Sequence, residues 1–129
     1  MAKVLKTNSI RELHFIEADF TAINLAKNNL NDQRLKFYWC DALKWKAPRL
    51  LDFIIMNPPF HHLGRALPTL GVDFIKVASR NLKKSGILWM VANRHLPYEE
   101  VIQRHFSSFS ELSGSKKFKV ILEENPINF

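Results

Sequence analysis

The sequence has a single cysteine and no long apolar run, and each shortage excludes a class of protein. One cysteine, Cys40, cannot form an internal disulfide, and it is typical of a chain that stays in the reducing cytosol. The longest apolar runs have only the length of a strand, so we expect no membrane span and no membrane partner. No apolar segment of the signal-peptide kind follows Met1. We therefore expect a cytoplasmic protein.

Residues with the spacing of metal ligands are missing as well. The five histidines and the one cysteine follow no metal-site pattern, so we expect no metal. The 129 residues, of which 47% are apolar and 24% charged, have the size and composition of one folded domain. The same composition excludes an intrinsically disordered chain.

Acidic residues are fewer than basic ones, and the net charge is +7. This charge fits a polyanionic partner such as RNA, but an ordinary basic surface explains it equally well. The densest basic segment, residues 116–119 (KKFK), fits an exposed strand face as well as a binding site.

Apolar residues recur at alternating strand and helix spacing along the chain. Asp19 is a good N-cap for the first of the helices, and Gly86 suits the end of the second. Strands are expected at residues 13–16, 35–39, 51–56 and 87–92, helices at 20–30, 72–82 and 99–106, and a hairpin at 109–112 and 118–122.

Strands separated by helices predict a three-layer α/β fold, with parallel strands and a closing antiparallel hairpin. Residues 61–71 lack periodicity, so we expect a loop that lies over a strand end as a lid. The tail at residues 123–129 is expected to be loosely ordered.

The strand expected at residues 51–56 stops at Asn57-Pro58-Pro59-Phe60. Its unbroken apolar run is typical of a strand buried on both faces. Each proline fixes φ and lacks an N–H group, so the sheet cannot continue through them, and Pro58 keeps Asn57 out of the helical region. Ligands of open α/β sheets bind at the carboxyl ends of strands. We therefore expect the active site at this turn.

The order of elements, with Asn57-Pro58-Pro59-Phe60 after a buried strand, resembles the class I S-adenosylmethionine-dependent methyltransferases that modify exocyclic amino groups. Three further segments resemble the bacterial ribosomal RNA guanine-N2 methyltransferases of the small- and large-subunit types: His61, residues 91–98 (VANRHLPY) and residues 117–120 (KFKV). The resemblance covers about residues 13–122. It implies a Rossmann-like sheet, S-adenosylmethionine as the cofactor, and ribosomal RNA as the partner.

Amine methylation gives the turn a chemical role. An amine attacks the methyl group of a sulfonium in line, so the protein acts mainly by positioning. The Asn57 side-chain oxygen and the Pro58 carbonyl can accept the two N–H groups of the target amine, Pro59 stiffens the turn, and the Phe60 ring can stack on the base. The alternative is a structural turn, capped by Asn57, with Phe60 in the core.

The resemblance also implies cofactor and substrate contacts. Glu17 stands where the family holds the ribose hydroxyls, and Asp41 where it holds the adenine amino group, with Asn57 as a further cofactor contact. Alternatively, Glu17 is a solvated side chain and Asp41 caps a turn. Besides Phe60, the expected substrate-binding residues are His61, Asn93 and Arg94.

The lack of glycine in the first part of the sequence distinguishes this chain from the family. The first of its four glycines is Gly64, so the family's first strand and its glycine-rich turn have no counterpart. We therefore expect residues 1–129 to form a truncated catalytic domain with impaired S-adenosylmethionine binding. Either the chain is a fragment, or a homodimer or complementing chain covers the exposed sheet, or the remaining strands close up differently.

Two other functions remain open. One is a non-catalytic RNA-binding or assembly module that keeps the fold and the basic charge. The other is methylation of a different amino group, such as an adenine in DNA or a glutamine side chain. Residues 91–98 favour ribosomal RNA.

Overall fold

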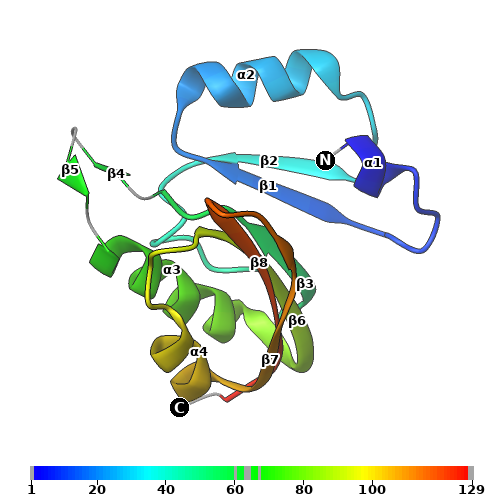
Figure 1. Ribbon diagram of the computed structural model, residues 1–129. Helices are drawn as coiled ribbons and strands as arrows, with labels where there is room; N and C mark the ends of the chain where they lie inside the picture. Colours follow the sequence, from blue (N-terminus) through cyan, green and yellow to red (C-terminus); the bar gives the residue numbers. More distant parts are fainter. Residues whose placement is uncertain (1, 60, 63–64, 67, 128–129) are drawn as a thin grey trace. The chain divides into compact units, whose positions relative to one another are not determined.

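The computed structural model describes residues 2–59, 61–62, 65–66 and 68–127, which fall into two compact units. Unit 1 comprises Met1–Trp45 and unit 2 comprises Lys46–Phe129 (Figure 1). The single domain expected from composition stays a prediction.

Unit 1 consists of a parallel strand pair and two helices. β1 (Leu13–Glu17) pairs with β2 (Leu35–Trp39), and α2 (Phe20–Asn29) connects them. The short α1 (Ala2–Leu5) precedes β1. As expected, the Asp19 side chain caps α2 by accepting a hydrogen bond from the Ala22 N–H at 3.0 Å.

Unit 2 contains a four-stranded sheet in the order β3-β6-β8-β7. β3 (Leu51–Met56) and β6 (Leu82–Asn93) are parallel. β8 (Phe118–Pro126) runs antiparallel to both β6 and β7 (Phe106–Gly114). The predicted α/β fold, with parallel strands and a closing hairpin, is confirmed. Among the described residues, β1 and β3 belong to separate sheets.

Two helices pack against one face of this sheet. α3 (Pro68–Asn81) and α4 (Glu99–His105) cover it in Figure 1. The core of unit 2 consists of Ile75, Ala78, Leu82, Leu88, Met90, Ala92, Leu96, Tyr98, Ile102, Phe106 and Ile121. A Cβ on Gly71 would lie 2.0 Å from the Tyr98 hydroxyl oxygen, so this contact between α3 and the segment before α4 requires glycine.

The other face of the sheet is open, which corrects the expectation for β3. Ile54 and Met56 pack against the core, but Phe53 and Ile55 are 50% and 57% exposed. Trp89 of β6 lies beside Ile55 and is 40% exposed. The prediction that β3 is buried on both faces is wrong, because the helices of unit 2 cover only one of them. We call the surface that carries Phe53, Ile55 and Trp89 the open face.

Two segments are more ordered than expected. The region predicted as a lid loop contains the antiparallel pair β4 (His61–His62) and β5 (Arg65–Ala66), and α3 already begins at Pro68. The predicted loose tail is wrong for residues 123–126, which continue β8. Glu123 and Glu124 are in register with both β6 and β7, and Pro126 is in register with β7. Pairing with neighbouring strands orders this part of the chain.

Glu123 of β8 is a buried acid on the helix-covered face. It lies opposite Leu88 of β6 and Phe109 of β7, and its side chain is fully buried. Neither carboxyl oxygen has a hydrogen-bond partner among the described residues. Burial raises the pKa of Glu123 to about 8, because the charged form loses its solvation. The side chain is therefore mostly neutral near pH 7.

Replacing Glu123 should change how stability depends on pH. The folded-state pKa of about 8 exceeds the ordinary glutamate pKa of 4.5. The stability linked to the neutral acid is therefore complete below pH 4.5 and is lost as the pH rises through about 8. Glu123→Gln should match the parent at low pH and exceed it at pH 9 by on the order of 1–3 kcal/mol. Urea unfolding followed by circular dichroism measures this difference.

Glu124→Gln is the matched control, because the neighbouring Glu124 is only half-buried. A parent protein whose free energy of unfolding is unchanged over this pH range, or a control that shifts as much as Glu123→Gln, would contradict the prediction.

Candidate active site

The turn after β3 presents Asn57 to solvent. Pro58 is buried and fixes the start of the turn, whereas Asn57 and Pro59 are exposed. The Asn57 carboxamide makes no hydrogen bond with any other described residue, so its oxygen is available to a ligand. Phe60 lies outside the described residues, and its stacking role stays a prediction. The backbone of His61 is part of β4, opposite Ala66.

β6 brings a second segment to the same edge of the sheet. Met56 pairs with Met90, and β6 continues for three residues to Asn93. Because β3 and β6 are parallel, Asn57 and Asn93 both lie at their carboxyl ends. The Asn93 carbonyl accepts a hydrogen bond from the Leu96 N–H at 3.0 Å and so closes the turn that follows β6.

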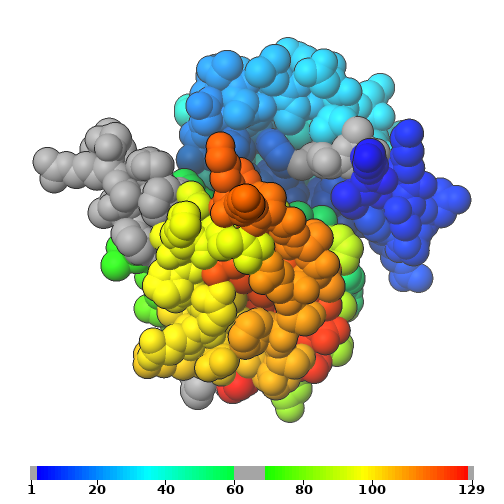
Figure 2. All heavy atoms as spheres, viewed as in Figure 1, coloured from blue at the N-terminus to red at the C-terminus, as the bar shows by residue number. Residues whose placement is uncertain are grey.

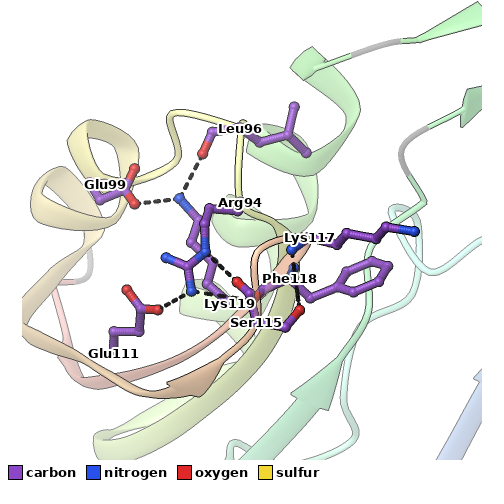
Figure 3. Close-up of polar contacts among 8 residues, drawn as sticks. All are labelled: Arg94, Leu96, Glu99, Glu111, Ser115, Lys117, Phe118 and Lys119. Atoms are coloured by element: carbon purple, nitrogen blue, oxygen red, sulfur yellow. Dashed lines mark hydrogen bonds and ion pairs between the residues drawn. The ribbon is translucent and has the colours of Figure 1, made fainter.

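Arg94, an expected substrate contact, is held by other parts of unit 2. Its Nε donates to the Ser115 carbonyl at 2.6 Å, and one terminal nitrogen donates to Glu111 at 2.5 Å and to the Phe118 carbonyl at 3.3 Å (Figure 3). This ion pair raises the pKa of Arg94 and lowers that of Glu111. These contacts fasten the turn after β6 to the β7–β8 hairpin. The predicted contact of Arg94 with RNA stays a prediction.

The close approach of Arg94 explains the glycine in the hairpin. A Cβ on Gly114 would lie 2.5 Å from the terminal nitrogen of Arg94 and 2.7 Å from the Phe118 carbonyl oxygen. The backbone oxygen cannot move aside as a side chain can, so residue 114 must lack a Cβ.

Lys119 fixes the turn after β6 from the helix-covered face of the sheet. It is only 4% exposed, and its Nζ donates to the Leu96 carbonyl at 2.9 Å and to the Glu99 carboxylate at the start of α4 (Figure 3). Sequence reasoning missed this role and treated Lys119 only as part of a basic run. The available signal was strand alternation, which places Lys119 opposite to Phe118 and Val120.

Unit 1 carries the two expected cofactor residues. Glu17 ends β1 and Asp41 follows β2, and the two strands are parallel, so both residues lie at the same edge. Glu17 accepts a hydrogen bond from the Asp19 N–H at 2.8 Å, and Asp41 accepts one from the Leu43 N–H at 2.9 Å. Asp41 thus caps a turn, which does not preclude a ligand. In each carboxylate the second oxygen has no hydrogen-bond partner among the described residues.

The predicted residues therefore gather at strand ends within each unit. Asn57, Asn93 and Arg94 belong to unit 2, and Glu17 and Asp41 belong to unit 1. Within the described ranges, no three histidine, cysteine or acidic side chains are grouped so that they could hold a metal ion. No helix among the residues that the structure describes is both long and apolar enough to cross a bilayer.

Most of this chain is similar in sequence to curated proteins. It is 33% identical over 121 residues to ribosomal RNA small subunit methyltransferase C of Shewanella pealeana, covering 92% of this chain and 35% of the relative. It is 31% identical over 116 residues to ribosomal RNA large subunit methyltransferase G of Shewanella putrefaciens, covering 85% of this chain and 31% of that protein. The chain thus spans about a third of the length of these relatives.

Solved structures show the same fold. The 16S rRNA N2 methyltransferase RsmC of T. thermophilus, in complex with AdoMet and guanosine, matches with a TM-score of 0.69 and 27% identity. That match covers 88% of this chain and 31% of the solved one. The N-methyltransferase NodS of Bradyrhizobium japonicum shares the fold, with a TM-score of 0.68 and 13% identity. That match covers 90% of this chain and 67% of NodS.

The family model of the methyltransferase small domain matches residues 1–122, nearly the whole sequence. The strand order of unit 2, the exposed Asn57 at the end of β3 and these relatives agree with that match. The chain belongs to the methyltransferase small domain family.

Proposed function

We propose that this chain is the catalytic part of an S-adenosylmethionine-dependent methyltransferase that acts on ribosomal RNA, with the exocyclic N2 of guanine as its target. The exposed Asn57 carboxamide, held at the carboxyl end of β3 by a buried Pro58, is the observation that carries the proposal. The relatives named as ribosomal RNA methyltransferases support the RNA substrate, and the solved relative with AdoMet and guanosine supports the cofactor and the base.

In the proposed reaction, Asn57 and Pro58 position the amine. The Asn57 side-chain oxygen and the Pro58 carbonyl accept the two N–H groups, which directs the nitrogen lone pair toward the methyl donor. The new C–N bond forms as the C–S bond of the sulfonium breaks, and the nitrogen then loses a proton to water. S-adenosylmethionine supplies the methyl group when it is bound.

Glu17 and Asp41 are suited to the polar groups of that cofactor. Ionised carboxylates only accept hydrogen bonds, and the ribose hydroxyls and the adenine amino group are donors. The oxygens of Glu17 and Asp41 that have no described partner can accept from them. We therefore propose Glu17 for the ribose and Asp41 for the adenine.

A further strand is needed to complete the fold. β3 is at the end of its sheet, although Phe53, Ile54, Ile55 and Met56 give it the composition of a central parallel strand. An apolar strand with an unpaired edge favours pairing with another chain. We propose that a second copy or a complementing chain supplies this strand, and that the chain alone binds S-adenosylmethionine weakly.

Asn57→Ala should reduce methyl transfer to ribosomal RNA about 100-fold, because the amine loses one of the two acceptors that orient it. Incorporation of tritiated methyl groups at saturating S-adenosylmethionine measures the rate. Asn28→Ala is the control, since Asn28 is exposed in the last turn of α2.

An Asn57→Ala rate equal to that of the parent would contradict the catalytic role. A parent that binds RNA without transferring methyl groups would instead favour a non-catalytic RNA-binding module. DNA and a glutamine-containing peptide serve as parallel substrates, and faster transfer to either would contradict the RNA substrate.

The chain alone should bind S-adenosylmethionine with a dissociation constant well above the micromolar range, because part of the expected binding site has no counterpart in the sequence. Isothermal titration calorimetry measures this constant directly. Micromolar binding by the isolated chain would show that no further strand is needed.

A further inference from the structure

We propose that the tip of the β7–β8 hairpin, residues 114–118, binds single-stranded RNA beside the target nucleotide. The inference rests on the proposed function and extends it, because it assigns RNA recognition to a surface separate from Asn57. Figure 2 shows the end of this hairpin, in orange, projecting from unit 2.

The tip has a fixed backbone. The Ser115 hydroxyl oxygen accepts hydrogen bonds from the N–H groups of Lys117 and Phe118, both at 3.2 Å. The Ser115 N–H donates to the Phe118 carbonyl at 2.7 Å, and the Arg94 N–H donates to the Lys117 carbonyl at 2.8 Å. Together with the guanidinium of Arg94, these bonds hold the tip to the end of β6. A ligand that binds there therefore meets a surface that is already ordered.

The charge of this region is concentrated at the tip. Arg94 is paired with Glu111, and Lys119 with Glu99. Lys116 and Lys117 are exposed and form no ion pair with any described residue. Two adjacent cations without a local counter-charge attract a polyanion.

Phe118 adds an aromatic ring next to these lysines. It is 51% exposed and lies opposite Asn93, so it belongs to the open face. Figure 3 shows the side chains of Lys117 and Phe118 leaving the tip on the same side, away from Glu111. Lysines that contact phosphates next to an aromatic ring that stacks on a base are typical of single-stranded nucleic-acid binding. A duplex does not offer such a base, because its bases are already stacked.

The position of the tip relates it to the candidate active site. Asn93 ends β6, which runs parallel to β3, so Phe118 lies at the same end of the sheet as Asn57. An RNA strand whose target base reaches Asn57 can therefore place neighbouring nucleotides on the tip. The proposed ligand is the strand next to the modified base.

Two sets of variants test the tip. The double variant K116A/K117A should weaken binding about tenfold at low salt and reduce the slope of log affinity against log salt by about 1.4. K83A/K84A is matched to it in charge, because these two exposed lysines lie at the opposite end of β6. Phe118→Leu should weaken binding about tenfold, whereas Phe118→Tyr keeps a ring that stacks and should bind like the parent.

Fluorescence anisotropy with a short labelled single-stranded RNA measures these affinities, and circular dichroism confirms that each variant folds. The proposal is overturned if K116A/K117A loses no more affinity than K83A/K84A, or if Phe118→Leu binds like the parent. Because the assay requires no methyl transfer, a chain that stays inactive at saturating S-adenosylmethionine, while its tip variants lose RNA affinity, refutes the proposed function alone. An active chain whose tip variants bind normally refutes only the role of the tip.

Discussion

The parallel pairing of β3 with β6 is the constraint on which the candidate site of unit 2 depends. Because the two strands run in the same direction, Asn57 and Asn93 end at one edge of the sheet. The two prolines stop β3 there, and β6 continues for three residues before it turns. Antiparallel pairing would have put these two residues at opposite edges. The sheet thus brings together residues that lie far apart in the sequence.

The turn after β6 keeps its position because two basic side chains, the buried Lys119 and the half-buried Arg94, bind backbone carbonyls around it. Burying Lys119 costs solvation free energy, and the Leu96 carbonyl and Glu99 compensate for it. Arg94 joins the same turn to the hairpin. Both basic residues hold backbone carbonyls as well as an acid, so they fix the path of the chain more strongly than an ordinary surface ion pair would.

The sequence predicted the order and kind of most elements, because apolar spacing and capping residues such as Asp19 act locally. It also predicted the turn at Asn57, since proline restricts the backbone wherever it occurs. It did not predict which face of β3 is covered, because that depends on where helices far along the chain pack. The burial of Glu123 was missed for the same reason: an acid near the end of a chain is usually solvated, and only pairing with β6 and β7 places it in the core.

Net charge alone could not distinguish an RNA-binding chain from a merely basic one, and the structure shows why. The lysines of the run at residues 116–119 have different roles, since Lys119 is buried and paired while Lys116 and Lys117 are exposed and unpaired among the described residues. Arg94, although it resembles a substrate contact in the sequence, forms bonds that order the hairpin carrying those two lysines. A cation that fixes the backbone and a cation that remains free for a ligand look alike in a sequence. They differ only in whether a carboxylate or carbonyl lies within reach, and that is decided by the pairing of β6, β8 and β7.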